Sequence, residues 1–579
     1  MNPTEPLIIL RDAARAVWLY FEKPHEIVSV STLGDVLPAL QRIEQLVESH
    51  GWYAAGFLSY EAAPAFDSAF STHAPSDVPL LWFGLYDEPR TSTVLTPTDA
   101  AFSLETWAPS VTRPAYGAAI DQVKEHIARG NTYQVNYTFR LTAGFHGEPW
   151  SLFSTMLQTQ PVNYPAYIQT GRHVICCASP ELFFALNGNQ ITCRPMKGTA
   201  PRGRTLTEDR AQAEALRASP KQCAENVMIV DMLRNDLGRI AHLGSVRVPA
   251  LFQTERYRTL WQMTSTVTAQ VDVPFHKLMA ALFPCASITG APKVSTMSII
   301  AALETAPRGV YTGTIGFLAP GRRAQFNVAI RTAVIDHESG QAEYGVGGGV
   351  VWDSTAGDEY AESLLKAKAI TTPQAAFSLL ETLRWAPPEG WFLREAHLSR
   401  LGNSAEYFGF IFDQALAEAR LTALEKNFTG PQRVRLLLSP EGVLKDEAVP
   451  LPPQSPAPLR VRLAAAPVDD ADIFLYHKTT HRSVYEQART AQPDCDDVLL
   501  YNQRGELTEF TIGNLVVELD GNLFTPPITC GLLPGTFRAD LLARNLVRER
   551  VLRREDLARC TKIFLVNSVR GWVETMLVE

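Results

Sequence analysis

The chain has 579 residues, of which 46% are hydrophobic and 20% charged, and its formal net charge is −8. A chain of this length exceeds what one hydrophobic core supports, so we expect two or more domains. The composition is typical of a soluble globular protein, and the negative net charge argues against a nucleic-acid-binding protein.

The N-terminus and the cysteines indicate the cellular compartment. The opening MNPTEPLIILRDAARAVWLYFEKPHE lacks a basic leader followed by an apolar stretch, and no apolar run is long enough to span a bilayer. We therefore expect neither a signal peptide nor a membrane span. The eight cysteines are scattered without a Cys-x-x-Cys pair. This arrangement suits a reducing cytosol and argues against a zinc site, so we predict a cytoplasmic protein.

The residue pattern divides the chain into two parts. Aromatic, β-rich segments at 16–22, 53–61 and 80–88 predict that the first 110 residues form strands and loops. Helical and strand patterns then mix up to about residue 370. The polar, proline-containing stretch ITTPQAA at 370–376 predicts a joint, and a new strand–helix pattern follows it. We therefore predict an α+β chain of two domains, residues 1–371 and 372–579, with a hinge inside the second at the proline-rich piece 449–459.

Residues 179–199, SPELFFALNGNQITCRPMKGT, predict a β-hairpin because the Asn-Gly dipeptide at 187–188 separates two β-rich runs. A two-residue turn there would pair Glu181 with Arg194. Lys197 lies just beyond, after a proline that cannot donate to a strand ladder. Glu181 and Lys197 are therefore candidates for one shared site, and the alternative for Lys197 is an ordinary solvated loop lysine.

Residues 219–239 predict a helix that opens with a capping box formed by Ser219 and Gln222. Glu225 falls on the same helical face as three apolar side chains, those of Met228, Ile229 and Met232. A carboxylate buried without a partner is costly. Glu225 is therefore either one half of a buried salt bridge or a metal ligand.

A second acidic pair lies in the helical stretch DEYAESLLKAK at 358–368, where Glu359 and Glu362 share one face. A solvated pair is the common alternative to a metal site. Just upstream, Gly347–Gly349 interrupt a strand pattern, which indicates close backbone approach to a ligand such as an anion held by amides. The strand pattern FNVAIRTAV brings Arg331 near these glycines, and a guanidinium beside amides is a good carboxylate receptor. The hard oxygen ligands favour magnesium.

Eight motifs between about residues 115 and 370 resemble, in sequence and in order, those of the chorismate-utilising enzymes. They are RGNTYQVNYT, SPELFF, PMKGT, AENVMIVDMLRNDLGR, SITGAPK, RGVYTGTIG, FNVAIRT, and GVGGGVV with DEYAE. The family includes anthranilate synthase component I, isochorismate synthases, salicylate synthases and aminodeoxychorismate synthase component I. The resemblance implies an N-terminal chorismate-binding β-sandwich with outer helices.

The resemblance also implies roles for individual residues. Glu225 and Glu362 match magnesium ligands, with Glu359 in or near that site, and Glu181 matches the general acid that protonates the departing hydroxyl. The chorismate contacts match Tyr311, Arg331, Gly198, Thr199 and the amides of Gly347, Gly348 and Gly349. Members that add water carry a lysine where this chain has Gln134, which argues against water addition.

The residue type at position 197 separates two groups of family members that add nitrogen. Anthranilate synthases typically carry alanine at this position, whereas the lysine in PMKGT resembles the signature of aminodeoxychorismate synthase. In that enzyme the amine is proposed to attack the chorismate ring and to be displaced by ammonia. A nucleophilic lysine must be neutral, so its pKa must be lowered. No cysteine lies in a Gly-x-Cys-x-Gly elbow, so we expect a separate glutamine amidotransferase subunit to supply the ammonia.

Four stretches of the C-terminal part carry a second resemblance: EAHLSRLGNSAEYFGF, LYHKTTHRSVYEQA, GELTEFTIGNLVVEL and GLLPGTFRADLL. In this order they are similar to the class IV pyridoxal-phosphate enzymes, which include branched-chain and D-amino-acid aminotransferases and aminodeoxychorismate lyase. The similarity covers about 378–579 and implies a class IV aminotransferase-like α+β fold. Members usually begin with a further strand and loop, so that edge is dispensed with here or replaced by the first domain.

On this resemblance, Lys478 binds pyridoxal phosphate covalently and Glu509 lies against the pyridine nitrogen, which keeps the ring an electron sink. Arg400 and the backbone around Thr536 hold the phosphate. The short turn formed by Thr511, Ile512, Gly513 and Asn514 lies along the cofactor. The resemblance is compatible with a homodimer of this domain and does not require one.

The two resemblances describe consecutive reactions, because aminodeoxychorismate lyase removes pyruvate from aminodeoxychorismate and leaves 4-aminobenzoate. We therefore interpret the chain as a bifunctional enzyme of 4-aminobenzoate synthesis for folate, with chorismate as substrate and magnesium and pyridoxal phosphate as cofactors. One alternative joins an anthranilate synthase component I to an amino-acid aminotransferase. The others are a synthase with an inactive C-terminal domain and a catalytically dead regulatory or scaffolding subunit.

Overall fold

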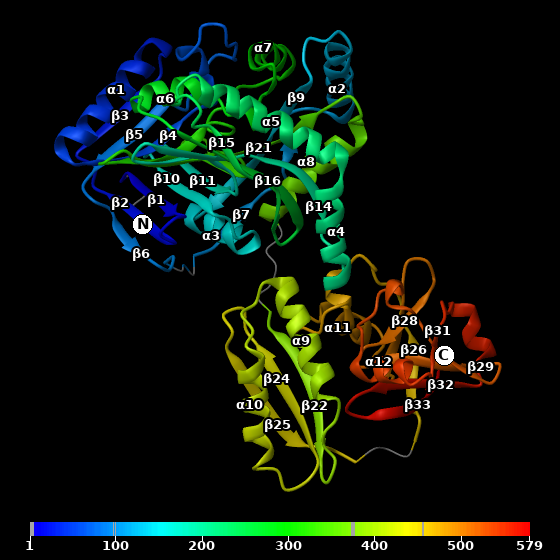
Figure 1. The fold of residues 1–579 in the computed structure, drawn as a ribbon. Helices are drawn as coiled ribbons and strands as arrows, with labels where there is room; N and C mark the ends of the chain where they lie inside the picture. Colours follow the sequence, from blue (N-terminus) through cyan, green and yellow to red (C-terminus); the bar gives the residue numbers. More distant parts are fainter. Residues whose placement is uncertain (1–4, 97, 99, 372–376, 454–456, 579) are drawn as a thin grey trace. The chain divides into compact units, whose positions relative to one another are not determined.

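The computed structural model describes the chain except for residues 1–4, 97, 99, 372–376, 454–456 and 579. The chain divides into two compact units (Figure 1). Unit 1 consists of Met1–Pro201 and Ala213–Gln374, and unit 2 of Arg202–Gln212 and Ala375–Glu579. The joint that we predict at 370–376 lies largely outside the described residues. Residues 202–212, which the sequence places in the first domain, belong to unit 2.

Unit 1 contains two antiparallel sheets. The first has eleven strands in the order β17 (Gly290–Ala291), β9 (Gln134–Gly147), β21 (Gln341–Val350), β20 (Thr332–Asp336), β11 (His173–Ser179), β10 (Tyr164–Gln169), β1 (Leu7–Asp12), β2 (Val17–Glu22) and β6 (Arg90–Ser92), with β7 (Phe102–Leu104) and β8 (Ala108–Pro109) also paired to β9. The second has ten, in the order β14 (Met196–Pro201), β16 (Leu260–Gln270), β13 (Gln190–Arg194), β12 (Leu182–Asn187), β19 (Arg323–Val328), β18 (Thr314–Ala319), β4 (Tyr53–Leu58), β5 (Leu81–Tyr86) and β3 (Glu26–Val30), with β15 (Arg247–Arg256) on β16.

The helices of unit 1 cover the outer faces of these sheets. They are α1 (Leu33–His50), α2 (Arg113–Ala128), α3 (Pro149–Thr159), α5 (Pro220–Gly238), α6 (Phe275–Leu282), α7 (Lys293–Leu303) and α8 (Ala356–Thr371), with short 3₁₀ turns η1 (Tyr60–Ala65) and η2 (Ala286–Ile288). Helix α4 (Leu206–Ala218) begins in unit 2 and ends in unit 1. Strands β2, β4 and β5 match the three predicted strands, but α1 shows that the first 110 residues are not only strands and loops.

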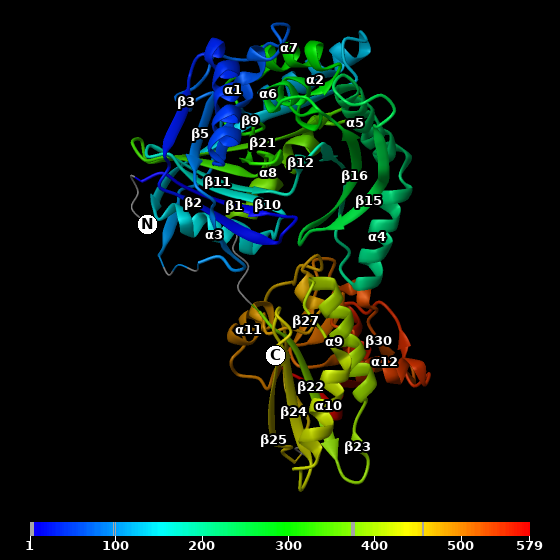
Figure 2. The same ribbon diagram turned by 60° about the vertical axis from the view of Figure 1, so that its left-hand side comes forward.

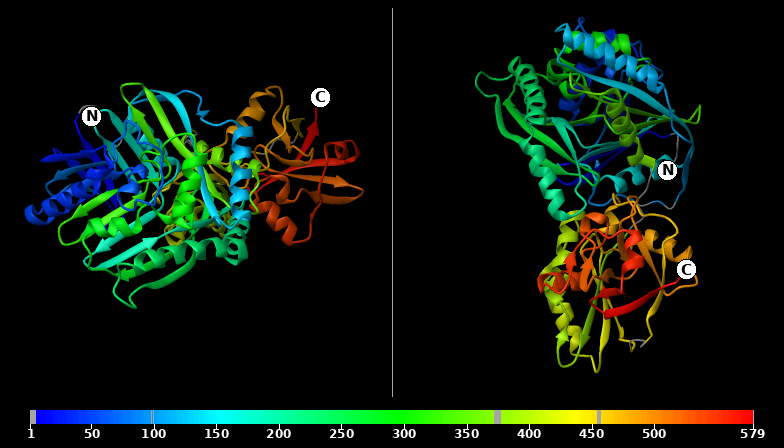
Figure 3. Two further views of the ribbon diagram at one scale, coloured as in Figure 1. Left: turned by 90° about the horizontal axis from the view of Figure 1, so that it is seen from above. Right: turned by 90° about the vertical axis from the view of Figure 1, so that its right-hand side faces the viewer.

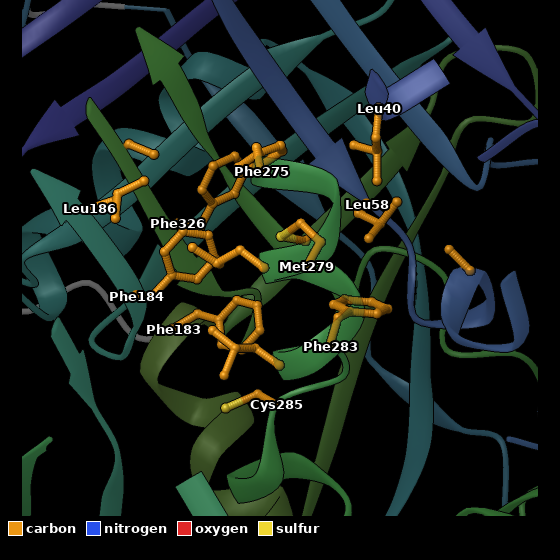
Figure 4. Packing of buried hydrophobic residues seen from close by; sticks show 14 of the residues in the cluster. Leu40, Leu58, Phe183, Phe184, Leu186, Phe275, Met279, Phe283, Cys285 and Phe326 are labelled. Atoms are coloured by element: carbon orange, nitrogen blue, oxygen red, sulfur yellow. The ribbon is translucent and has the colours of Figure 1, made fainter. Parts of the chain in front are cut away.

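Three hydrophobic clusters make this arrangement a β-sandwich with outer helices. One lies between the sheets and combines Ile8, Phe21 and Ile175 of the first with Phe57 and Phe317 of the second. A second packs the other face of the second sheet against α1, α5 and α6, with the rings of Phe184 and Phe326 stacked at 5.3 Å (Figure 4). The third packs the first sheet against α2, α3 and α8. Figures 1 and 2 show α1 and α6 beside each other on the second sheet.

Unit 2 is also α+β, as predicted. A sheet in the order β23 (Gly390–Trp391), β22 (Leu379–Ala386), β24 (Gln432–Leu438) and β25 (Leu444–Pro450) packs against α9 (Arg394–Phe408) and α10 (Gln414–Glu425). A second sheet runs β28 (Leu507–Phe510), β27 (Asp497–Tyr501), β26 (Leu459–Leu463), β33 (Gly571–Leu577), β32 (Lys562–Asn567), β29 (Asn514–Leu519), β30 (Asn522–Thr525) and β31 (Arg548–Glu549). The stretch predicted as a hinge, 449–459, runs from the end of β25 to the first residue of β26 and lies partly outside the described residues.

The strands of this second sheet close on themselves, because β28 also pairs with β29. Most of them appear in orange and red in Figure 3. The remaining elements of unit 2 are α11 (Ser483–Thr490), α12 (Thr536–Ala543) and the 3₁₀ turns η3 (Ile473–Leu475), η4 (Ile528–Cys530) and η5 (Arg554–Arg559). None of the helices in the described part of the chain is long and apolar enough to span a membrane.

The predicted hairpin forms β12 and β13, but its register is not the predicted one. Asn187 pairs with Gln190, so the turn residues are Gly188 and Asn189. Gly188 takes a φ of +59°, which glycine adopts without strain. Because the ladder also shifts between Leu182 and Ala185, it is Leu182 and not Glu181 that faces Arg194.

Candidate active sites

The first candidate site is built around β14, which carries Lys197. The chain breaks its ladder at the preceding proline, as predicted, so that β13 and β14 pair separately with β16. Gly198 takes a φ of +102°, a conformation that side chains rarely adopt, and the register against β16 shifts at this point. The glycine in PMKGT therefore allows the irregular backbone on which Lys197 stands.

Lys197 lies beside the glycine run of β21. A Cβ atom on Gly349 would lie 2.7 Å from Lys197 Nζ and 2.1 Å from Gln134 Nε2. A Cβ atom on Gly348 would lie 3.1 Å from a carboxylate oxygen of Glu359. These glycines make room for polar side chains, and the approach of a ligand to their backbone stays a prediction.

Glu181 is buried and shares this site with Lys197. Its Oε1 accepts a hydrogen bond from the Met196 amide at 3.4 Å. Burial raises the pKa of Glu181 to about 7, against the opposing effects of Ser287, the Met196 amide, Lys197 and Arg331. A carboxyl group that is partly protonated at neutral pH can act as a general acid.

The same surroundings act on Lys197 in the opposite sense. Burial lowers the pKa of its amine, the carboxylate of Glu225 works against this, and Lys366 lowers it further. Lys366 was not anticipated from the sequence. It donates to the Gly347 carbonyl oxygen at 2.8 Å and forms an ion pair with Glu362 at 3.0 Å. Burial and a neighbouring cation thus both favour the neutral form of Lys197 that a nucleophile needs.

The three predicted metal ligands lie near one another without forming a closed cage. Burial raises the pKa of Glu225, which Glu362 raises further, and burial likewise raises the pKa of Glu359, whose Oε1 accepts from Ser354 at 2.7 Å. Among the described residues, no group of three His, Cys, Asp or Glu side chains lies close enough to hold a metal ion. The carboxylate oxygens fit magnesium, which commonly uses one or two carboxylates together with substrate oxygens and water.

Helix α5 begins at the predicted cap with one arm of the predicted capping box, since the Ser219 side chain accepts from the Gln222 amide at 3.4 Å. Its buried face, however, consists of Asn226, Ile229, Val230, Leu233, Asp236 and Leu237. Glu225 and the two methionines flank this face, so the predicted apolar stripe is displaced by one residue. Asn226 connects this helix to the site, because its Nδ2 donates to the Lys197 carbonyl oxygen at 3.1 Å.

Arg331 lies where the chain crosses from one sheet to the other. The predicted single strand is two strands, β19 in the second sheet and β20 in the first, and Arg331 precedes β20 with a φ of +53°. Its NH1 donates to Gln160 Oε1 at 2.6 Å, and its guanidinium lies 5.5 Å from the ring centre of Tyr257. Gln160 and Tyr257 carried no signal in the sequence, because they join the site only through tertiary packing.

The remaining predicted chorismate contacts differ in exposure. Tyr311 is buried, and a Cβ atom on Gly345 would lie 2.2 Å from its ring. The Arg140 guanidinium lies 5.0 Å from the centre of the same ring. Thr199 is exposed and donates to Gln262 Oε1 at 3.5 Å.

The second candidate site, in unit 2, is built around Lys478. Its carbonyl oxygen accepts from the Leu380 amide at 2.9 Å, which ties the segment after η3 to β22. Burial lowers the pKa of the Lys478 amine to about 8, and the guanidinium groups of Arg400 and Arg482 lower it further. A substantial fraction of Lys478 is therefore neutral at physiological pH, which favours addition to an aldehyde.

Glu509, on β28, is a buried carboxyl group with three protein donors. Its Oε1 accepts from Tyr485 Oη at 2.8 Å and from the Leu533 amide at 3.1 Å, and its Oε2 accepts from Asn514 Nδ2 at 3.1 Å. Burial raises the pKa of Glu509 to about 7. Because Lys478 lowers that pKa in turn, the two predicted residues lie within electrostatic reach of each other.

Arg400 and Thr536 are brought together by two residues that the sequence did not single out. Glu381 is buried and binds Arg400 through two hydrogen bonds of 2.8 and 2.6 Å. His397 contacts Glu381 at 2.6 Å through Nδ1 and Thr536 Oγ1 at 3.2 Å through Nε2. Burial alone would raise the pKa of Glu381, but Arg400 and His397 hold it below its ordinary value.

The turn 511–514 joins β28 to β29. The Thr511 hydroxyl donates to the buried carboxylate of Asp497, so this side chain holds the turn in place. A Cβ atom on Gly513 would lie 2.6 Å from a Leu565 methyl group. Ile512 is 39% exposed, whereas Asn514 is buried against Glu509.

These residues fit pyridoxal phosphate. The amine of Lys478, whose pKa is lowered, suits the aldehyde, and the buried carboxyl group of Glu509 nearby suits the pyridine nitrogen. Arg400, whose NH1 donates to the Pro534 carbonyl oxygen at 3.3 Å, and Thr536 at the start of α12 suit the phosphate.

Comparison with known proteins finds one family match in each part of the chain. Residues 91–372 match the family of the chorismate binding enzyme, and residues 378–575 match amino-transferase class IV. The chain is 39% identical over 277 residues to aminodeoxychorismate synthase component 1 of Bacillus subtilis, covering 48% of this chain and 58% of the relative. It is 40% identical over 266 residues to the Escherichia coli protein of the same name, covering 46% of this chain and 58% of that protein.

The fold of unit 1 is shared with a solved enzyme. Anthranilate synthase component I from Streptococcus pneumoniae aligns with a TM-score of 0.55 and 24% identity, over 64% of this chain and 93% of the other. This likeness concerns the fold. The chain spans less than two thirds of the length of the curated relatives named above.

Proposed function

Because the chain joins a chorismate binding enzyme domain to a class IV aminotransferase domain, we propose that it converts chorismate to 4-aminobenzoate in two consecutive reactions. In the first, ammonia and chorismate give 4-amino-4-deoxychorismate and water. In the second, this intermediate loses pyruvate and becomes aromatic. The observation that carries the proposal is the shared site of Lys197 and Glu181, an amine of lowered and a carboxyl of raised pKa.

In the first reaction, the neutral amine of Lys197 attacks the chorismate ring while Glu181 donates its proton to the departing hydroxyl, which leaves as water. Ammonia then displaces the lysine, and the amine returns to its free form. Arg331 and Tyr311 bind and orient the substrate, with Gly198, Thr199 and the Gly347–Gly349 backbone around it. Glu225, Glu359 and Glu362 would hold magnesium, whose charge would neutralise a substrate carboxylate.

In the second reaction, Lys478 binds pyridoxal phosphate, which supplies an electron sink when bound. Lys478, with a pKa of about 8, can accept and return a proton next to the substrate. Glu509 keeps a proton near the pyridine nitrogen. Arg400 and Thr536 orient the cofactor through its phosphate.

Two further elements of the proposal come from the relatives and from the sequence. The relatives are named as component 1 of their enzyme, so we propose a separate glutamine amidotransferase subunit as the ammonia donor, with ammonium as its substitute. We also propose a cytoplasmic location, which the scattered cysteines of the sequence favour.

One incubation tests the proposal. The pure protein is mixed with chorismate, ammonium, magnesium and pyridoxal phosphate, and the products are separated by mass and fluorescence. We expect 4-aminobenzoate and pyruvate in equal amounts. Anthranilate as the main product would instead support a synthase of that type, and accumulation of aminodeoxychorismate without pyruvate would leave the second half inactive.

A further inference from the structure

Residues Arg202–Gln212 come from the middle of the chorismate-binding sequence but belong to unit 2. They follow directly after β14. An internal salt bridge fixes their shape, since Arg202 binds the buried Asp209 at 2.6 and 2.8 Å and the Gly203 amide donates to Asp209 Oδ1 at 3.0 Å. A Cβ atom on Gly203 would lie 2.2 Å from the Asp209 amide nitrogen. The segment thus consists of a glycine-dependent turn and the first residues of α4.

This segment is anchored to α9. The buried Tyr407 hydroxyl donates to the Gly203 carbonyl oxygen at 2.7 Å. In return, Arg202 NH2 donates to the Tyr407 carbonyl oxygen at 2.8 Å, and its guanidinium lies 4.3 Å from the centre of the Tyr407 ring. Two hydrogen bonds and one cation–π contact therefore hold Arg202 and Gly203 against Tyr407 within unit 2.

The segment also holds the two residues that precede Lys478. The Nε2 atom of His477 lies 3.1 Å from the Arg204 carbonyl oxygen, and its Nδ1 lies 2.9 Å from Ser404 Oγ. Arg204 NH1 donates to Tyr476 Oη at 3.0 Å. His477 is buried, and its ring lies 4.3 Å from that of Tyr407.

The hydrogen bonds of His477 define its protonation. Burial lowers the pKa of this imidazole to about 4, so it is neutral under physiological conditions. The Arg204 carbonyl can only accept, so Nε2 carries the proton and Nδ1 accepts from the Ser404 hydroxyl. Both ring nitrogens are satisfied only while the segment is in place. A buried imidazole that lost this partner would have to move, and Lys478 is the next residue.

We propose that residues 202–212 form part of the second active site, and that His477 is a positioning residue through which they fix Lys478. Lys478 is then held from two sides, by the His477 contacts before it and by the Leu380 amide at its own carbonyl oxygen. The inference rests on the proposed function in one respect, namely that Lys478 binds pyridoxal phosphate.

The test uses the full-length chain, stripped of cofactor and titrated with pyridoxal phosphate while the visible absorbance is followed. His477→Ala should weaken binding roughly tenfold, the factor that corresponds to about 1.4 kcal/mol. It should also move the pH midpoint of the absorbance, because a displaced Lys478 meets Arg400, Arg482, Glu381 and Glu509 at different distances. His477→Gln keeps an amide donor for the Arg204 carbonyl and should restore most of the affinity and the midpoint.

Two further variants complete the experiment. Tyr407→Phe removes only the anchor to Gly203 and should shift both readouts in the same direction by a smaller amount. If His477→Ala does not fold, Ser404→Ala takes its place, since it removes the partner of Nδ1 without truncating the ring. The control is Arg420→Ala, which removes an exposed partner of Asp446 elsewhere in unit 2 and should change neither readout.

The outcomes separate the inference from the proposed function. A wild-type chain that binds no pyridoxal phosphate overturns both. A wild-type chain that binds it, together with His477→Ala and Ser404→Ala variants of unchanged affinity and unchanged pH midpoint, overturns the inference alone.

Discussion

Lys197 and Gly349 lie so close that a single methyl group on the glycine would come within 2.7 Å of the lysine Nζ. The two residues belong to different sheets, since Lys197 is on β14 and Gly349 on β21. The amine that we propose as nucleophile therefore fits in its position only because residue 349 has no side chain.

This relationship predicts the effect of Gly349→Ala. The new methyl group must displace both Gln134 and Lys197, and a displacement of about 1 Å can cost on the order of 10²-fold in rate. We expect a loss of that size in aminodeoxychorismate formation, measured with ammonium as nitrogen donor. Gly34→Ala is the matched control, because no atom lies within 4 Å of the added Cβ there. Equal rates for the two variants would contradict the close approach of Gly349 to Lys197 and Gln134.

Replacing the amine itself should be more damaging. Lys197→Ala is expected to lower amination of chorismate by at least about 10³-fold while leaving the thermal midpoint unchanged or higher, because a desolvated amine is removed. Chromatography of the products would also show whether anthranilate is formed. The exposed Lys221→Ala serves as control. Wild-type rates in the Lys197 variant would exclude it as the nucleophile.

The pH dependence of the first reaction follows from Glu181. Its pKa is raised to about 7, so the acid form that donates a proton dominates below this pH and is lost above it. Lys197 must be neutral to attack, so the rate should also rise with pH as this amine loses its proton. We expect a bell-shaped profile of kcat/KM whose falling limb lies near pH 7. Glu181→Gln should abolish most activity, and a falling limb that persists in this variant would assign it to another group.

Metal dependence tests the carboxylates. Glu225→Gln and Glu362→Gln should each weaken magnesium binding at least roughly tenfold in calorimetry with chorismate present, because each removes one anionic oxygen ligand. Glu214→Gln, on the exposed surface of α4, should bind magnesium like the wild type. Unchanged magnesium affinity in both the Glu225 and the Glu362 variant would contradict their assignment as metal ligands.

The second site should be visible by eye. A lysine that binds pyridoxal phosphate covalently makes the protein yellow, and borohydride should bleach it and fix the cofactor on the peptide containing LYHKTTHR. Lys478→Ala should remove the colour and stop pyruvate release while aminodeoxychorismate accumulates. A colourless wild-type protein, even after addition of pyridoxal phosphate, would show that the second half is not an active lyase.

The sequence by itself determined the local elements and the types of chemical group. The two-domain α+β organisation is confirmed, as are strands β2, β4 and β5 and the Ser219 cap of α5, because these depend on residues that are neighbours in the chain. Short motifs and the two family resemblances also name an acid, an amine and a guanidinium for the candidate sites, and the roles of these residues stay predictions.

Only the tertiary structure decided how these pieces meet. The slipped register of the 182–194 hairpin, the crossing of Arg331 between sheets, and the approach of Gln134 and Lys366 to Lys197 all depend on packing between distant segments. The clearest case is Arg202–Gln212, which lies within the stretch that matches the chorismate binding enzyme family yet contacts His477 in unit 2. A local pattern reports which face of an element is apolar, but the partner of that face is selected by the packing of the whole chain.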